Sequence, residues 1–184
     1  YDSRCWKFIY YDGSTREYDP VSNQWIKTTV TGPPTNASGW NWAGRSNMTY
    51  DSDRDRVVMF SYSGQTYEYH EGAWTNRNAQ NINNPGYNRF KYAMVYDPTI
   101  RKVILIGGTI GPGVSYAYSG PIVVYEETWT YDPVSNNWEP VLFNNTNPLA
   151  SKGFSSTKVN QTVAVFDPST NKVVIPYGGG YSYN

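Results

Sequence analysis

Three carboxylates at alternate positions form the first candidate for chemistry in this sequence. Asp51, Asp53 and Asp55 fall within one short stretch, and calcium-binding loops supply carboxylate ligands with this spacing. The stretch lacks the glycine that such loops use, and Arg54 and Arg56 neutralise its charge. We therefore interpret it as a solvated turn between two strands, and we expect no metal ligands in the chain.

Two adjacent carboxylates, Glu126 and Glu127, are of the residue type that glycosidases use in pairs. Neighbouring residues of a strand point to opposite faces, so this pair is not expected to flank one bond. The glycine runs Gly107-Gly108 and Gly178-Gly180 follow apolar stretches but open no helix, which argues against a phosphate site. We expect a chain with no catalytic residue and no cofactor.

Aromatic residues in two Gly- and Asn-rich stretches remain as ligand-binding candidates. Trp40, Asn41 and Trp42 form one group, and Tyr116 and Tyr118 form the other. Flat apolar rings beside polar groups stack on sugar rings or anchor protein partners. The alternative, that these rings fold back onto the surface of a sheet, stays open.

Four Asn-x-Ser/Thr sequons make Asn36, Asn47, Asn144 and Asn160 candidates for glycosylation. Asn36 and Asn144 lie in Pro- and Asn-rich connections, where an oligosaccharide can project into water. Asn47 begins a predicted strand, and Asn160 comes just before another. In a secreted eukaryotic protein we expect modification at Asn36 and Asn144 before the other two.

Composition excludes several classes of partner. The chain has 184 residues, and its 15 basic and 15 acidic side chains cancel, so neither nucleic-acid nor anionic-membrane binding is predicted. No apolar run approaches the roughly 18 residues of a membrane helix, so no membrane insertion is predicted.

Lone Cys5 excludes an intrachain disulfide framework. The first residues contain neither a signal peptide nor an initiator Met, which predicts a processed form or an excised piece.

Two interleaved repeats predict the elements that must position these residues. Residues 127–141 contain Tyr-Asp-Pro followed by Trp, and 15–25 and 66–74 repeat this pattern as strand, turn and strand. We expect the Trp residues of the three copies to occupy equivalent positions: Trp25, Trp74 and Trp138. A second repeat is a hairpin whose latter strand is almost wholly apolar, which is typical of burial on both faces; its copies cover 47–60, 93–108 and 163–179.

Together the repeats give units of four short strands, at about 5–30, 46–78, 92–142 and 162–184. The first unit lacks its first strand, and the last has only its first two. A loop insertion, 109–121, separates the second and third strands of the third unit. No stretch shows a sustained helical period, and regular short strands predict a propeller rather than a sandwich.

The run Tyr-Asp-Pro, apolar strand, Gly-Gly, Thr-Trp-x-Tyr-Asp-Pro and a later Trp resembles the Kelch repeat. The match is best in 92–142 and degraded in 46–78, where Ser61-Tyr62 replaces the glycine pair. The resemblance implies an all-β fold of Kelch-type blades, each of four antiparallel strands around a central channel, here an incomplete propeller of about three to four blades. It also implies that the glycine pair, Tyr and Trp are packing residues without a catalytic role.

The resemblance extends to the central domain of galactose oxidase, a copper enzyme. That copper site requires two His and two Tyr, one of them crosslinked to a Cys. This chain has a single His, His70, which stands where other units have the turn Asp. We therefore expect structural roles for His70 and Cys5, with His70 on a surface turn.

Kelch propellers act most often as binding scaffolds through their loops. We expect a non-catalytic extracellular or cell-surface binding or assembly module, glycosylated as a structural subunit, whose partners are proteins, further copies of itself through open blade edges, or glycans. One alternative is a fragment of an intracellular, cytoplasmic Kelch adaptor. Another is a non-catalytic part of a secreted carbohydrate-active or oxidase enzyme. Incomplete terminal blades predict either continuation into more blades or a homo-oligomer.

Overall fold

The structure is a computed structural model that describes residues 7–30, 32–33, 46–77, 85–86, 89–110, 123–124, 127–142 and 163–175. These residues form strands and turns and contain no helix. The expected all-β class is therefore confirmed. None of the described segments is a helix that could cross a membrane.

Three antiparallel sheets follow one another along the chain, each running in sequence order except for one insertion. The first sheet contains β1 (Phe8–Tyr11), β2 (Thr15–Asp19) and β3 (Gln24–Lys27). The second contains β4 (Asn47–Asp51), β5 (Arg56–Phe60), β6 (Thr66–His70) and β7 (Ala73–Asn76). The third contains β9 (Ala93–Asp97), β10 (Lys102–Ile106), β13 (Thr128–Asp132) and β14 (Asn137–Pro140). A hairpin follows, β15 (Val165–Asp167) and β16 (Lys172–Val174).

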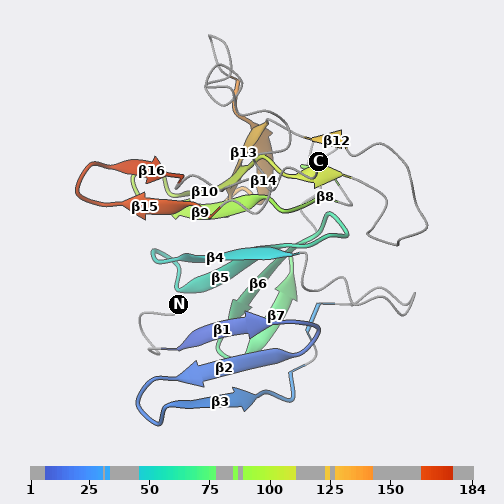
Figure 1. Cartoon of the computed structure of the whole chain (residues 1–184), viewed down its shortest axis with the longest axis vertical. Coiled ribbons are helices and arrows are strands. Elements are labelled where there is room, and N and C mark those ends of the chain that lie inside the picture. The colour runs from blue at the N-terminus through green and yellow to red at the C-terminus, as the bar shows by residue number, and fades with distance from the viewer. Residues whose placement is uncertain are drawn as a thin grey trace, which may run out of the picture.

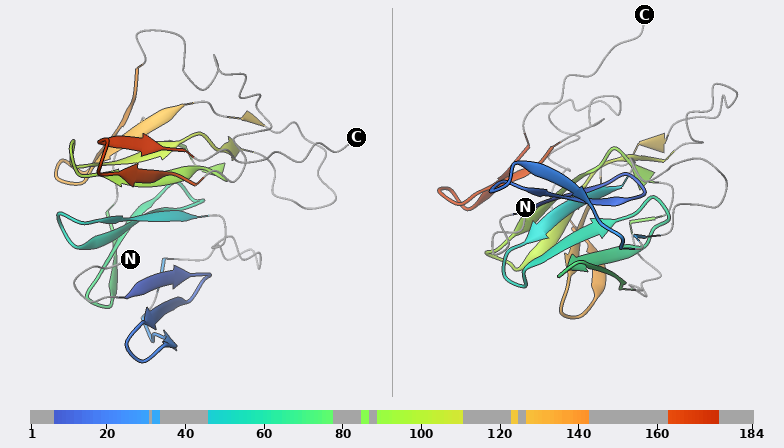
Figure 2. Two further views of the ribbon diagram at one scale, coloured as in Figure 1. Left: turned by 60° about the vertical axis from the view of Figure 1, so that its left-hand side comes forward. Right: turned by 90° about the horizontal axis from the view of Figure 1, so that it is seen from below.

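The sheets stack in sequence order along the long axis of the molecule, as Figures 1 and 2 show. The first strands of successive units lie beside one another, because β4 contacts β9 and β9 contacts β15. Adjacent first strands are the arrangement of propeller blades around an axis. The predicted architecture, four-stranded antiparallel blades in an incomplete propeller, is confirmed.

The repeated turns share one hydrogen bond between an Asp side chain and the backbone. An Asp at the end of a strand accepts a hydrogen bond from the backbone N–H two residues on, which fixes the bend. The donors are Val21, Asp53, Thr99, Val134 and Ser169, bonded to Asp19, Asp51, Asp97, Asp132 and Asp167 respectively. The carboxylates around Asp51 form a turn, as predicted, but the prediction that this turn is solvated is wrong, because Asp51 and Asp55 are 0% and 6% exposed. In the described ranges no cluster of His, Cys, Asp and Glu could hold a metal ion.

The apolar second strands differ in burial. β5 and β10 are almost wholly buried, as their sequences predicted, because each lies between two sheets. In β16 the Lys172 and Val174 side chains are exposed, so the prediction of burial on both faces is wrong there. The described residues place a sheet against only one side of the β15–β16 hairpin, with Phe166 and Val173 packed on the cluster that contains Ala93 and Val95.

A small additional sheet begins the insertion of the third unit. It consists of β8 (Arg89–Phe90), β11 (Thr109–Ile110) and β12 (Val123–Val124) in the order β12-β11-β8. The sequence predicted a loop from residue 109 onward, so the strand at its start was missed. Gly108 lies between the end of β10 and the start of β11. Its φ is 109°, and a Cβ there would lie 3.0 Å from Tyr92 Cβ, so this position favours glycine.

Candidate functional site

Each of the three sheets carries one Tyr–Trp pair across its last two strands. The two rings are opposite each other in the strand register, and their centroids are almost equally far apart in every copy. The pairs are Tyr18–Trp25 at 5.2 Å, Tyr69–Trp74 at 5.1 Å and Tyr131–Trp138 at 5.1 Å. The prediction that the three Trp residues occupy equivalent positions is confirmed.

Two of these indoles join their sheet to the preceding one. Trp74 Nε1 donates to Thr15 Oγ1 at 2.8 Å, and Trp138 Nε1 donates to Thr66 Oγ1 at 2.9 Å. Thr15 and Thr66 are the first residues of β2 and β6, which are equivalent strands. The same contact therefore recurs at successive sheet interfaces.

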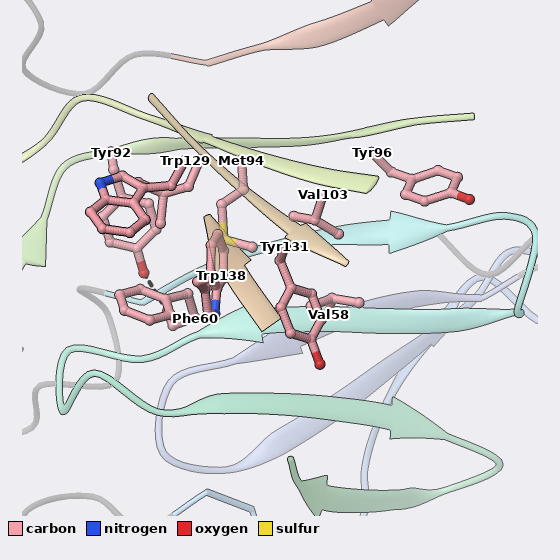
Figure 3. Close-up of a cluster of buried hydrophobic side chains, with 10 residues drawn as sticks. Val58, Phe60, Tyr92, Met94, Tyr96, Val103, Trp129, Tyr131 and Trp138 are labelled. Atoms are coloured by element: carbon pink, nitrogen blue, oxygen red, sulfur yellow. Dashed lines mark hydrogen bonds between the residues drawn. The ribbon is translucent and has the colours of Figure 1, made fainter. Parts of the chain in front are cut away.

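Aromatic packing fills the interface between the second and third sheets, as Figure 3 shows. Trp138 is 1% exposed and lies edge-on to Phe60, with ring centroids 5.2 Å apart. The Tyr92 hydroxyl donates to the Phe60 carbonyl and accepts from the Asn47 backbone N–H at 2.9 Å. Burial raises the pKa of the Tyr92 phenol, so this hydroxyl stays a hydrogen-bond donor. It contributes to packing and provides no reactive group.

A charge network around a buried carboxylate, which sequence reasoning missed, lies within the second sheet. The Glu68 side chain is only 1% exposed; its Oε1 accepts from Arg54 Nη2 at 2.7 Å and lies 3.6 Å from Arg77 Nε, and its Oε2 lies 3.8 Å from Arg56 Nε. Asp51, also buried, accepts from Arg54 Nε at 2.7 Å. The proximity of Arg54 to Asp51 was visible in the sequence, but the approach of Glu68 required the pairing of β5 with β6.

Arg89 provides a second buried polar centre, next to the small sheet. Its guanidinium donates to the carbonyls of Pro85 and Gly107 at 2.6 and 2.8 Å, and to Glu127 Oε2 at 3.0 Å. Glu127 Oε2 also accepts from Trp129 Nε1 at 2.8 Å. Glu127 thus serves in local packing, and Glu126 lies outside the described residues.

The first sheet leaves its aromatic face open. Phe8, Tyr10 and Trp25 are 45%, 46% and 55% exposed, and Tyr18 lies between Phe8 and Trp25 with ring centroids 5.9 and 5.2 Å away. The Arg16 guanidinium lies 5.8 Å from the Tyr10 ring centroid. We call these five residues the open aromatic face. In the other two sheets the equivalent Tyr–Trp pair packs against the preceding sheet.

The residues predicted as ligand contacts cannot be placed on this face. Three groups of predicted residues lie outside the described ranges: the ligand contacts Trp40, Asn41, Trp42, Tyr116 and Tyr118, the sequon residues Asn36, Asn144 and Asn160, and Cys5.

His70 ends β6 at the position of the turn Asp in the other sheets, as predicted. It is half-buried rather than on the surface, with Nδ1 2.8 Å from the Asp55 carbonyl oxygen.

Asn47 is expected to remain unglycosylated in the native protein. Its side-chain Nδ2, the atom that would carry the sugar, donates to the Tyr92 carbonyl. The sequon hydroxyl of Thr49 accepts from the Tyr96 backbone N–H at 3.1 Å. Both groups belong to the contact between the second and third sheets, so an oligosaccharide would separate the sheets. Peptide mapping of the natively expressed protein would test this, and an occupied Asn47 would contradict the β4–β9 contact.

Comparison with known proteins supports the fold alone. No family model matches the chain, and no curated protein matches it. Among solved structures, that of YjhT is similar, with a TM-score of 0.53 and 11% sequence identity. The match covers 91% of this chain and 46% of that one. The chain therefore spans less than half the length of a structure with a related arrangement of sheets.

Proposed function

We propose that the chain is a non-catalytic binding and assembly module of Kelch-type propeller blades, acting outside the cell or at its surface. Its ligands are proteins, further blades or glycans, held at the open aromatic face and at the loops around it. The open aromatic face is the observation that carries the proposal. Exposed rings in mutual contact supply a flat, preorganised apolar surface, which suits a protein partner or a sugar ring.

The buried polar groups described here support a scaffold. Buried Glu68 pairs with half-buried Arg54, and buried Arg89 pairs with exposed Glu127. Thr15 and Thr66 accept the indole hydrogen bonds that join successive sheets. These groups are therefore engaged in contacts within and between sheets. Tyr10 and Trp25 of the first sheet are 46% and 55% exposed, so their rings can contact a ligand.

Fluorescence of Trp25 tests this proposal. Subtracting the spectrum of Trp25→Phe from that of the wild type isolates the emission of one exposed indole. We expect this difference emission to shift to shorter wavelength when the protein is concentrated, or when soluble oligosaccharides of glucose, galactose, mannose or xylose are added. The same titrations on Val21→Ala, changed at an exposed turn position of the same sheet, provide the control. Emission that stays that of a solvated indole under all these conditions would contradict binding through this face.

Natural glycosylation tests the proposed location. If the protein is secreted, mass should be attached at Asn36 and Asn144, which the sequence places in long connections. An intact-mass measurement on protein from its natural source, followed by peptide mapping, would detect attached hexose or pentose. Unmodified Asn36 and Asn144 in that material would remove this support for an extracellular protein.

A further inference from the structure

The outer strand of the first sheet, β3, exposes large apolar side chains on both of its faces. All four of its side chains are exposed, and among them Trp25 and Ile26 point to opposite faces. At the register position of Lys27 in β3, the outer strand of the third sheet has Pro140, which has no N–H to offer a further strand. An apolar edge strand without proline pairs readily with another strand.

Two residues of β3 direct their backbone groups away from β2. The Thr28 N–H donates to the Thr15 carbonyl at 3.0 Å, and hydrogen-bonded residues alternate along an antiparallel pair. Ile26 therefore bonds to β2, while the N–H and C=O groups of Trp25 and Lys27 point to the outer edge. In the described part of the chain no strand pairs with β3 on that side.

The second sheet leaves this edge clear. Two hydrogen bonds join it to β2: the Tyr69 hydroxyl donates to Glu17 at 2.6 Å, and the Trp74 indole donates to Thr15 at 2.8 Å. Figures 1 and 2 show β3 at one end of the stacked sheets, beyond the β6–β7 hairpin. A strand can therefore approach β3 in the plane of its sheet without meeting the described part of the second sheet.

Charge and turn geometry select one register for pairing β3 with another β3. Centring the pair on Lys27 would place two lysines opposite each other, which is unfavourable. Centring it on Trp25 would place Lys27 opposite Asn23, whose φ of 57° belongs to the turn. Centring it on Ile26 places Trp25 of each copy opposite Lys27 of the other, where the ammonium can lie over the indole. The outward N–H and C=O groups of these two residues then meet, so each pair exchanges both backbone hydrogen bonds.

We propose that β3 pairs antiparallel with β3 of a second copy of this chain, centred on Ile26, so that the two first sheets become one continuous sheet. The two Ile26 side chains pack against each other on the face toward the second sheets, and the open aromatic faces join on the opposite face. Both copies use the same surface, so the contact is isologous and closes as a dimer. This inference rests on the proposed assembly function and identifies its partner.

Disulfide crosslinking tests the register. The Cα atoms of directly opposite, non-hydrogen-bonded residues lie about 4.5 Å apart in an antiparallel pair, which a disulfide can span. Ile26→Cys, in a Cys5→Ser background, should therefore form a disulfide-linked dimer on mild oxidation with diamide. Gln24→Cys, on the same face of the strand, is the matched control. Its two copies would lie about 13 Å apart or more along the paired strands and should not bridge.

Sedimentation velocity tests the pairing itself. The wild-type chain should show a monomer–dimer equilibrium without larger species. Lys27→Pro removes an N–H that points away from β2, at the position where the third sheet accommodates Pro140. It should raise the dissociation constant about 30-fold or more, because each copy loses a backbone hydrogen bond to the other. Lys27→Ala keeps this N–H and should weaken association less.

The controls separate folding from pairing. Circular dichroism checks that each variant keeps its sheets, and Val21→Ala, at an exposed turn position, should associate like the wild type. The two cysteine variants decide the question if Lys27→Pro does not fold. A monomeric wild type, equal crosslinking of Ile26→Cys and Gln24→Cys, or association unaffected by Lys27→Pro would overturn the proposal. A monomer whose Trp25 emission still responds to oligosaccharides would leave the proposed binding function standing.

Discussion

Replacing Trp138 with alanine is expected to lower the free energy of unfolding by about 3–5 kcal/mol. Its indole is 1% exposed, packs between Phe60 and Tyr131, and donates to Thr66. The substitution removes a large apolar side chain, opens a cavity between two sheets and leaves the Thr66 hydroxyl without its donor. Urea denaturation, followed by circular dichroism at a concentration where the chain is monomeric, would measure the loss.

Trp25→Ala is the matched control for this prediction, because it changes the same residue type at the equivalent register position. Trp25 is 55% exposed, and among the described residues its ring contacts are with Tyr10 and Tyr18 of its own sheet. In the monomer its loss should be no more than about 1 kcal/mol, as is usual at the surface. Equal losses for Trp25→Ala and Trp138→Ala would contradict the assignment of the indole to sheet-to-sheet packing.

The repeat explains why most of the fold could be predicted from the sequence. A turn Asp, an alternating strand and a Trp at fixed distance specify a hairpin locally, so their recurrence gave the order of strands within each sheet. The Trp positions followed from that spacing, and the structure pairs Tyr18, Tyr69 and Tyr131 with them in one register. Sequence spacing was sufficient to predict the strand order because each sheet is built mainly from strands that follow one another closely in the chain.

Contacts between blades could not be predicted in the same way. The hydrogen bond from Trp138 to Thr66 joins residues far apart in the chain, and which sheet faces which is decided by stacking. The same holds for the open aromatic face: Trp25 has the sequence context of a buried indole and is exposed, because no described sheet precedes its own. The predicted loop contacts Trp40 and Tyr116 lie outside the described residues, so their roles remain predictions.

Burial on both faces also depended on stacking. The apolar run of β10 and that of β16 look alike in the sequence, yet only β10 lies between two described sheets. An apolar pattern reports that a strand can be buried, and the number of covering neighbours decides whether it is. The blade sequence therefore specifies surfaces that need a neighbour, which is the physical basis for the stacked core.

Glu68→Gln is expected to cost about 1.5–3 kcal/mol of unfolding free energy, because it removes the charge of a buried carboxylate that three half-buried arginines surround. Among the described residues Arg54 keeps Asp51 as its ionic partner, and Arg77 and Arg56 lose a carboxylate 3.6 and 3.8 Å away. The glutamine keeps the shape of the side chain, so the loss reports charge rather than volume. Thermal and urea denaturation of the variant would measure it.

Two further variants decide what the Glu68 network contributes. Glu139→Gln removes the same charge from an exposed pair with Lys102 and should cost no more than about 1 kcal/mol. Glu68→Asp keeps the charge but withdraws it by one methylene, so its loss should fall between those of the two glutamine variants. If Glu68→Gln were as mild as Glu139→Gln, the charge of Glu68 would not stabilise the second sheet, in which its ionic partners lie. The second and third sheets would still be joined by Arg77 Nη2, which donates to the Pro133 carbonyl at 3.3 Å, and by Asn136 Nδ2, which donates to the Arg77 carbonyl at 2.6 Å. The hydrogen bond from Trp138 to Thr66 joins the same two sheets.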